Sequence, residues 1–253
     1  MDIWLIISGW CVGIVIGATG MGGGLIMTPL LILGFGVPPK VAVATDLIFA
    51  SVTKLFGAWQ HWRQQTVDYV LLKRVLLGSI PGTLIGIVVL KWLADGHENL
   101  PDEFISKTLA IVFFVIVAIM ILQSAKKRMG EQLADGTQMK LARVAIIGFV
   151  VGFLVAVTSV GSGSLFAALL FLTYPFSAAR LVGTDIVHGV LITGLAGLSH
   201  FFLGTIDLAL AGNLLLGSVP GVLIGSKLGA VLPDRVIRLG LIVMLLVSAV
   251  KLW

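Results

Sequence analysis

The stretch TGMGGGLIMTPLL, residues 19–31, reappears as TSVGSGSLFAALL, residues 158–170. Each copy places a glycine cluster before an apolar run. At the same offset of 139 residues and without a gap, residues 19–86 match residues 158–225 at 22 of 68 positions. Similarity at a fixed spacing is the signature of repeated structural units, so the chain contains two copies of one unit. The matched pairs include Thr45 with Thr184, Asp46 with Asp185, His61 with His200, Thr66 with Thr205, and Asp68 with Asp207.

The composition is typical of a membrane protein. Of the 253 residues, 58% are hydrophobic and 11% are charged, and the mean hydropathy is +1.10. An average soluble domain has about 25% charged residues. Apolar runs of about 20 residues, long enough to cross the hydrocarbon core of a bilayer, follow one another along the chain. We therefore expect an all-α polytopic integral membrane protein, which excludes a soluble enzyme.

The charges and the cysteine exclude further classes. The formal net charge is +5, but most lysines and arginines lie between apolar runs, where they orient a membrane protein. We therefore expect no nucleic-acid partner. Cys11 is the only cysteine, which excludes an internal disulfide or a thiolate metal site. The sequence contains no recognisable metal-ligand, nucleotide-binding or catalytic pattern, and we expect no cofactor.

We expect about five apolar segments in each unit, and eight to ten in all. The units are residues 1–125 and residues 143–253, joined by a charged cytoplasmic linker at residues 126–142. The expected segments are residues 3–19, 24–36, 41–61, 70–92, 104–125, 143–158, 163–175, 181–203, 208–231 and 235–252. The second segment of each unit has only about 13 residues, so it is either a re-entrant or broken helix or a full crossing.

An odd number of crossings per unit makes the two copies antiparallel, and the basic residues support this inversion. With the second unit inverted, most loop lysines and arginines lie on the cytoplasmic side, namely Arg63, Lys73, Arg74, Lys126, Lys127, Arg128, Lys140, Arg143, Arg180, Lys227, Arg235 and Arg238. The other side keeps Lys40, Lys91, Lys107 and Lys251. Inverted repeats are a common build of secondary transporters, with the site near the midplane where the repeats meet. We expect a multi-pass protein of the cytoplasmic (inner) membrane with both termini outside.

The glycine clusters are candidates for an anion site. Glycine leaves backbone N–H groups accessible, and a helix N-terminus at membrane depth suits an anion. The candidate substrate-binding residues here are Gly22, Gly23, Gly24, Gly161, Ser162, Gly163 and Ser164, with Thr28 and Ser159 among the flanking hydroxyls. The alternative is that these glycines allow only a kink or close packing.

A second set of glycines predicts helix packing. Gly78, Gly82 and Gly86 are spaced by four residues, so they line one face of a helix. The second unit repeats the pattern from Gly217 to Gly225. Smooth faces of this kind let membrane helices approach closely. We expect packing, with a hinge role at the proline inside each stretch as the alternative.

Few ionisable residues lie inside the apolar segments, where they are costly and usually functional. Thr45-Asp46 and Thr184-Asp185 occupy equivalent positions at the start of the third segment of each unit. The two carboxylates either cap helix N-termini or accept a proton or a cation during transport. We assign Thr45 and Thr184 to substrate binding, and both aspartates to coupling.

Two further ionisable residues break the symmetry between the units. Lys54 aligns with Thr193, and His188 aligns with Phe49. A buried lysine needs a counter-charge, so Lys54 pairs either with an aspartate or with an anionic substrate. His188 either relays a proton near neutral pH or is only hydrogen-bonded. We assign Lys54 to substrate binding and His188 to coupling.

Two glycine-rich stretches, each followed by Thr-Asp and then by a G-S-x-P-G-x-x-x-G helix, resemble the TauE/SafE family of membrane transporters. This family is also called the sulfite exporter or toluene sulfonate uptake permease family, and the resemblance covers nearly the whole chain. It implies secondary, ion-coupled transport of sulfur-containing anions such as sulfite, sulfoacetate or other organosulfonates, usually by export. Ser162 stands where the first copy has Gly23, which favours one asymmetric anion site over two equivalent ones.

We therefore expect an anion transporter and not an enzyme, with a small anionic substrate, protons as the coupling ion and the lipid bilayer around it. The alternatives are a passive anion channel, a carrier of another small solute, and a subunit of a larger complex. The glycine faces serve packing within one chain or in a homo-oligomer equally well. Flux that saturates and responds to a pH gradient separates a carrier from a channel.

Overall fold

Every regular element in the described part of the chain is helical. The computed structural model describes residues 2–19, 23–94, 100–128, 141–163, 165–166, 178–203, 205–228 and 234–253. The first unit contains α1 (Ile3–Thr19), the 3-10 turn η1 (Gly23–Leu25), α2 (Met27–Phe35), α3 (Pro39–Arg63), α4 (Tyr69–Ala94) and α5 (Leu100–Arg128). The second unit contains α6 (Leu141–Thr158), α8 (Ala178–Phe202), α9 (Leu208–Leu228) and α10 (Asp234–Leu252).

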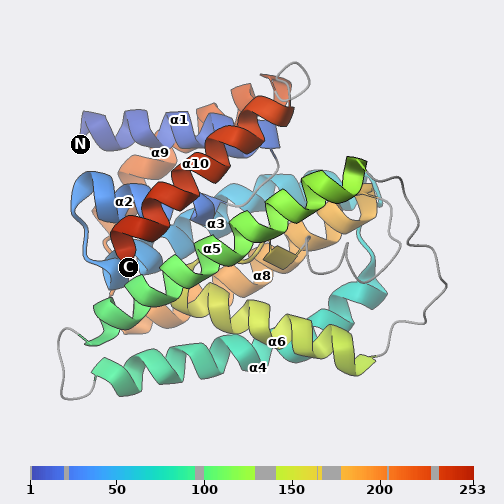
Figure 1. The fold of residues 1–253 in the computed structure, drawn as a ribbon, viewed down its shortest axis with the longest axis horizontal. Helices are drawn as coiled ribbons and strands as arrows, with labels where there is room; N and C mark the ends of the chain where they lie inside the picture. The colour runs from blue at the N-terminus through green and yellow to red at the C-terminus, as the bar shows by residue number, and fades with distance from the viewer. Residues whose placement is uncertain are drawn as a thin grey trace.

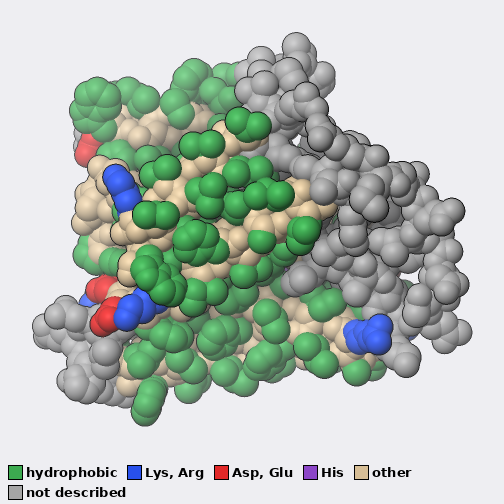
Figure 2. Space-filling view, viewed as in Figure 1, with side chains coloured by type: hydrophobic (Ala, Val, Ile, Leu, Met, Phe, Trp, Pro, Cys, Tyr) green, Lys and Arg blue, Asp and Glu red, His purple; other side chains and the backbone are tan. Residues whose placement is uncertain are grey.

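Six helices in the described residues are long and apolar enough to cross a membrane. These spans are Pro39–Arg63, Tyr69–Ala94, Pro101–Leu122, Leu141–Thr158, Arg180–Phe202 and Leu208–Gly225. Hydrophobic side chains cover the middle of the face drawn in Figure 2, and charged side chains lie towards its left and right ends. The expected all-α polytopic membrane protein is therefore confirmed.

The helix break predicted at the first glycine cluster is present. After η1, the helix α2 (Met27–Phe35) has nine residues, about 14 Å at 1.5 Å per residue and so about half of a hydrocarbon core. It ends at Gly36, whose φ of 65° lies in the left-handed region that glycine adopts without strain. In the second unit α6 ends at Thr158 and the chain turns through residues 159–163. Most of the predicted segment 163–175 lies outside the described residues.

The two units run in opposite directions and interlock. In Figure 1, α1 runs from the left and α6 from the right, and the same reversal relates α4 to α9 and α5 to α10. The main packed pairs join one unit to the other: α1 lies against α9, α4 against α6, and α3 against α8. Both termini lie at the left of Figure 1, where we define the termini end. The ends of α5 and α6 that flank the linker lie at the right, where we define the linker end.

Glycine faces bring these helices close together, as the sequence predicts. A Cβ added to Gly82 of α4 would lie 2.2 Å from the carbonyl oxygen of Phe149 in α6. At the repeat-related position, a Cβ on Gly221 of α9 would lie 2.4 Å from the carbonyl oxygen of Trp10 in α1. Neither position accepts a larger residue unless the helices separate. The duplicated glycine face therefore makes the same contact twice, once on each side of the molecule.

Candidate functional site

The two aspartates lie inside their helices and not at helix N-termini. Because α3 begins at Pro39 and α8 is described from Ala178, Asp46 and Asp185 each follow seven residues of helix. The capping alternative is therefore wrong, because both helices begin at least seven residues before the aspartate. Asp46 is fully buried and Asp185 is 4% exposed. Both carboxylates therefore face the protein interior.

Asp46 joins the two units. Its Oδ2 accepts hydrogen bonds from the hydroxyl of Thr28 in α2 and from the hydroxyl of Ser159 after α6, each at 2.7 Å. Its Oδ1 is buried and has no hydrogen-bond partner among the described residues. A buried polar atom without a partner is costly. This oxygen is therefore a place where a proton or a ligand atom can bind.

The turn after α6 bends sharply and presents its backbone to the second aspartate. The φ angles of Ser159, Gly161 and Gly163 are 60°, 130° and 117°, conformations that glycine adopts far more readily than other residues. The backbone N–H of Gly163 donates to Oδ1 of Asp185 at 3.0 Å. The second glycine cluster therefore holds one carboxylate through its backbone and the other through the Ser159 hydroxyl.

Lys54 reaches this turn from the first unit. Its Nζ donates to the hydroxyl of Ser162 at 2.6 Å and to the Ser162 carbonyl oxygen at 3.2 Å, and the residue is 8% exposed. A Cβ on Gly189 would lie 2.7 Å from Nζ, so glycine at this position makes room for the ammonium. No salt bridge joins Lys54 to a carboxylate of the described residues. The lysine is linked to Asp185 indirectly, through the Ser162–Gly163 backbone.

His188 follows Asp185 by one helical turn. Its Nε2 shares a hydrogen bond of 2.9 Å with the hydroxyl of Ser79 in α4. Its ring stacks on Phe166, with 4.6 Å between the ring centroids. Nδ1 is buried and without a partner among the described residues. The predicted hydrogen-bonded role of His188 is therefore present, and Nδ1 offers a second buried atom to a proton or a ligand.

Thr45 and Thr184 each accept a backbone hydrogen bond from the opposite unit. The N–H of Asp207 donates to Oγ1 of Thr45 at 3.3 Å, and the N–H of Asp68 donates to Oγ1 of Thr184 at 2.9 Å. The Thr184 hydroxyl also donates to the carbonyl oxygen of Arg180 at 2.7 Å. Protein groups therefore engage both hydroxyls that we predicted to bind substrate.

The first glycine cluster packs against the carboxylate of Asp46. A Cβ on Gly24 would lie 3.3 Å from Oδ2 of Asp46 and 2.4 Å from the carbonyl oxygen of Ser159. Glycine at this position lets the break in the first unit touch the break in the second. The predicted residues Gly22 and Ser164 lie outside the described residues.

The sequence interpretation missed Ser79. This serine belongs to the glycine-rich packing motif of α4. Within the described part of the chain, its repeat partner Ser218 donates only to the Leu215 carbonyl of its own helix, at 3.4 Å. The motif itself does not distinguish the two serines. The one available signal was the replacement of Phe49 by His188 in the second unit, since a buried histidine needs a polar partner.

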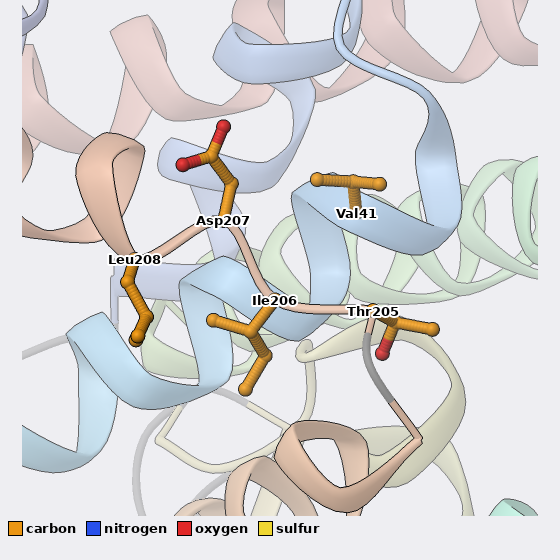
Figure 3. A pocket seen from close by; sticks show the side chains of 5 residues that line it. All are labelled: Val41, Thr205, Ile206, Asp207 and Leu208. Carbon is orange, nitrogen blue, oxygen red and sulfur yellow. The ribbon is translucent and has the colours of Figure 1, made fainter.

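The buried cluster opens into neither of the two described pockets. The first pocket is a shallow depression at the termini end, lined by Val41 and residues 205–208. Figure 3 shows that it forms where the loop before α9 lies over α3. The second pocket is lined by Phe114, Val250 and Trp253. Asp46, Asp185, Lys54 and His188 are each at most 8% exposed, so solvent does not reach these side chains freely in this conformation.

Inverted, interlocked helical units, a broken helix and ionisable groups buried where the units meet are features that recur in membrane transporters. The model of the sulfite exporter TauE/SafE family matches residues 5–252. The chain therefore belongs to this family and is a membrane transporter. The family prediction from the glycine and Thr-Asp motifs is confirmed.

Relatives of the chain are also named as transporters. The probable membrane transporter protein YjnA of Bacillus subtilis (strain 168) is 39% identical over 255 residues, with both chains covered in full. YunE of the same organism, with the same description, is 28% identical and covers 96% of this chain and 92% of its own. The probable membrane transporter protein MJ0441 of Methanocaldococcus jannaschii is 25% identical, with 92% and 86% covered. No solved structure matches the chain.

Proposed function

We propose that this transporter exports small sulfur-containing anions, such as sulfite, sulfoacetate or other organosulfonates, across the cytoplasmic membrane as a proton-coupled secondary carrier. The family's description as sulfite exporters supports the substrate class and the direction. The observation that carries an anionic substrate is Lys54, a buried ammonium whose described hydrogen-bond partner, Ser162, is neutral.

The substrate anion binds at the turn after α6. The ammonium of Lys54 and the N–H of Gly163 both meet this turn, and oxyanions are bound by such charged and backbone donors. The N–H of Gly163 is bonded to Asp185 in the described conformation. An anion that takes this N–H leaves the carboxylate without its donor and favours its protonation, which couples substrate binding to proton binding.

Charge balance supports protons as the coupling ion. The cluster contains one lysine, Lys54, and two aspartates, Asp46 and Asp185. With all three ionised, a bound anion adds to a net negative charge, which a low-dielectric interior disfavours. Protons on the aspartates or on His188 offset this charge. When the anion and protons move together, a proton gradient directed into the cell opposes export, so export requires an outward gradient of the anion that exceeds it.

Contacts between the units support alternating access at the repeat interface. Asp46 and Lys54 belong to the first unit, and their partners Ser159 and Ser162 belong to the second. A movement of one unit against the other therefore changes the geometry of the site itself. Carriers built from inverted repeats move in this way around a fixed midplane site.

Flux into proteoliposomes of the purified protein tests this proposal. Sulfite, sulfoacetate, taurine, sulfate and chloride are offered separately, with and without an imposed pH gradient. We expect saturable movement of sulfite or a sulfonate that the gradient stimulates. Unsaturable flux that ignores the gradient would indicate a passive anion channel, and transport of none of these anions would overturn the substrate class.

A further inference from the structure

Two loops of the same pattern lie at opposite ends of the molecule. Each carries a Thr-x-Asp sequence, residues 66–68 between α3 and α4 and residues 205–207 between α8 and α9. In Figure 1, α4 begins at the linker end and α9 begins at the termini end. The two loops are related by the internal repeat, yet our predictions from sequence gave them no role in transport.

The threonine of each loop fastens it to the preceding helix. The hydroxyl of Thr66 donates to the carbonyl oxygen of His61 at 3.1 Å and lies 2.8 Å from Nδ1 of the same histidine. The hydroxyl of Thr205 donates to the carbonyl oxygen of His200 at 3.0 Å and lies 3.2 Å from its Nδ1. Both loops therefore begin with the same histidine–threonine contact.

The aspartate of each loop fastens it to the following helix. Oδ1 of Asp68 accepts a hydrogen bond from the N–H of Leu71 at 3.0 Å, and Oδ1 of Asp207 accepts one from the N–H of Leu210 at 2.9 Å. These are N-cap contacts, which satisfy backbone donors at the helix start. Each loop is therefore a short connection that hydrogen bonds fix to both flanking helices of its own unit.

A third hydrogen bond joins each Thr-x-Asp loop to the other unit. The N–H of Asp207 donates to Thr45 at 3.3 Å, and the N–H of Asp68 donates to Thr184 at 2.9 Å. In both helices the residue after this threonine is an aspartate of the buried cluster. The threonine that bonds to the loop and the aspartate of the site are therefore neighbours in the same helical turn.

We propose that the two Thr-x-Asp loops are the gates of the transporter, with the Thr45–Asp207 bond as the latch at the termini end and the Thr184–Asp68 bond as the latch at the linker end. This proposal rests on the proposed alternating access. Both latches are formed in the described conformation, and the site is buried. Release of one latch with retention of the other opens the site towards one end. A shift of either aspartate on substrate binding also moves the adjacent latch threonine.

The two gates differ in tightness. Gly183 packs against the linker-end loop, where an added Cβ would lie 2.6 Å from Oγ1 of Thr66, and the first unit has Ala44 at the matching position. At the termini end, the loop borders the shallow depression lined by Val41 and residues 205–208 (Figure 3). The latch there is also longer, 3.3 Å against 2.9 Å. We expect the termini-end gate to open more readily.

Labelling of a buried cysteine from each side of the membrane tests the gates. In a Cys11→Ser background, Thr193→Cys places a reporter at a fully buried position that aligns with the site lysine. Lys251→Cys and Arg143→Cys, at exposed positions near the termini end and the linker end, calibrate which side a reagent reaches. A membrane-impermeant maleimide is added to one side of sealed vesicles, and the labelling rate of the reporter is measured.

We expect Thr45→Val to raise labelling of the reporter from the termini side about fivefold, the equivalent of about 1 kcal/mol for one hydrogen bond. Thr184→Val produces the same increase from the linker side. Thr53→Val is the matched control, because among the described residues its hydroxyl donates only to carbonyl oxygens of its own helix, at 2.8 and 3.1 Å. It leaves both rates unchanged. Thr45→Ser keeps the acceptor and restores the original rate, which separates loss of the latch from a folding defect.

The gate proposal is overturned if both latch variants act on the same side, if neither changes a rate, or if Thr53→Val has the same effect as Thr45→Val. Labelling requires no substrate, so this test is independent of the flux assay. Side-specific labelling in a protein that moves no sulfur-containing anion would overturn the proposed substrate and support the gates.

Discussion

The two helix breaks at the glycine clusters occupy matching positions in the two units, but they make different contacts. In the first unit, Gly24 packs closely against Asp46, and the chain continues into a half-helix. In the second unit, the turn at residues 159–163 bonds Asp46, Lys54 and Asp185 together. One break is therefore a packing surface, and the other is the centre of the candidate site.

This difference indicates that the repeat provides a shared framework and that residues present in only one unit make the site asymmetric. The glycine faces and the gate loops are present in both units and make equivalent contacts. At the site the units share the aspartates but differ at three other positions: Lys54 aligns with Thr193, His188 with Phe49, and Gly189 with Ala50. Matched changes in the shared framework should therefore have equal effects, whereas matched changes at the site should not.

The largest effect is expected at the duplicated glycine face. Gly82→Ala and Gly221→Ala each place a methyl group 2.2–2.4 Å from a backbone oxygen of the facing helix, and overpacking of this kind costs about 1–3 kcal/mol or more. We expect both variants to lose thermal stability by similar amounts. Gly212→Ala, in α9 with no atom within 4 Å of its added Cβ, is the control and keeps or raises stability. A large loss of thermal stability in one glycine variant and none in the other would contradict equivalent packing of the two glycine faces.

The next effect separates the two aspartates. Asp46→Asn removes the carboxylate with the unpartnered Oδ1, so we expect loss of stimulation by a pH gradient while substrate exchange continues. Asp185→Asn disturbs the carboxylate bonded to Gly163, and we expect substrate exchange to fall about tenfold as well, the scale of a lost charged hydrogen bond. Proteoliposome flux and counterflow measure both properties. Identical behaviour of the two variants would contradict an asymmetric site.

A smaller effect is expected where a glycine makes room for the lysine. Gly189→Ala brings a Cβ within 2.7 Å of Nζ of Lys54 and shifts the ammonium, so we expect substrate affinity to fall about fivefold through a weakened hydrogen bond. Gly57→Ala is the matched control between the same two helices, since its Cβ makes an ordinary 3.4 Å contact with Ile186. If both variants bind substrate equally well, the lysine does not need this space.

Local patterns predicted the shared framework well because helical periodicity is a local property. The four-residue spacing from Gly78 to Gly86 defines a helix face without reference to any other segment, and the first glycine cluster marks a break for the same reason. The third segment was expected at residues 41–61, close to α3 at Pro39–Arg63, but the description of Asp46 as lying at its start was wrong. Asp46 lies two helical turns inside α3, and Pro39, a residue favoured in the first turn of a helix, already indicates the earlier start.

Local sequence patterns could not predict which residues contact one another at the site. Lys54 and Ser162 are separated by 108 residues and belong to different units, so their meeting depends on how the inverted units interlock. The bond between Ser79 and His188 spans 109 residues and joins two helices in the same way. The sequence identified Lys54 and His188 as exceptions to the repeat, but their partners follow only from the packing of the units.

The central claim is that Lys54 makes the asymmetric site an anion site. The most direct test compares substrate counterflow in the variants Lys54→Gln and Lys107→Gln. Lys107 lies on the surface and pairs with Glu103 one helical turn away, so its replacement controls for the loss of a positive charge. We expect Lys54→Gln to lose at least about tenfold in affinity for sulfite or the transported sulfonate, as for a lost charged hydrogen bond, and Lys107→Gln to match the unmodified protein. Unchanged affinity and unchanged anion preference in Lys54→Gln would contradict the account.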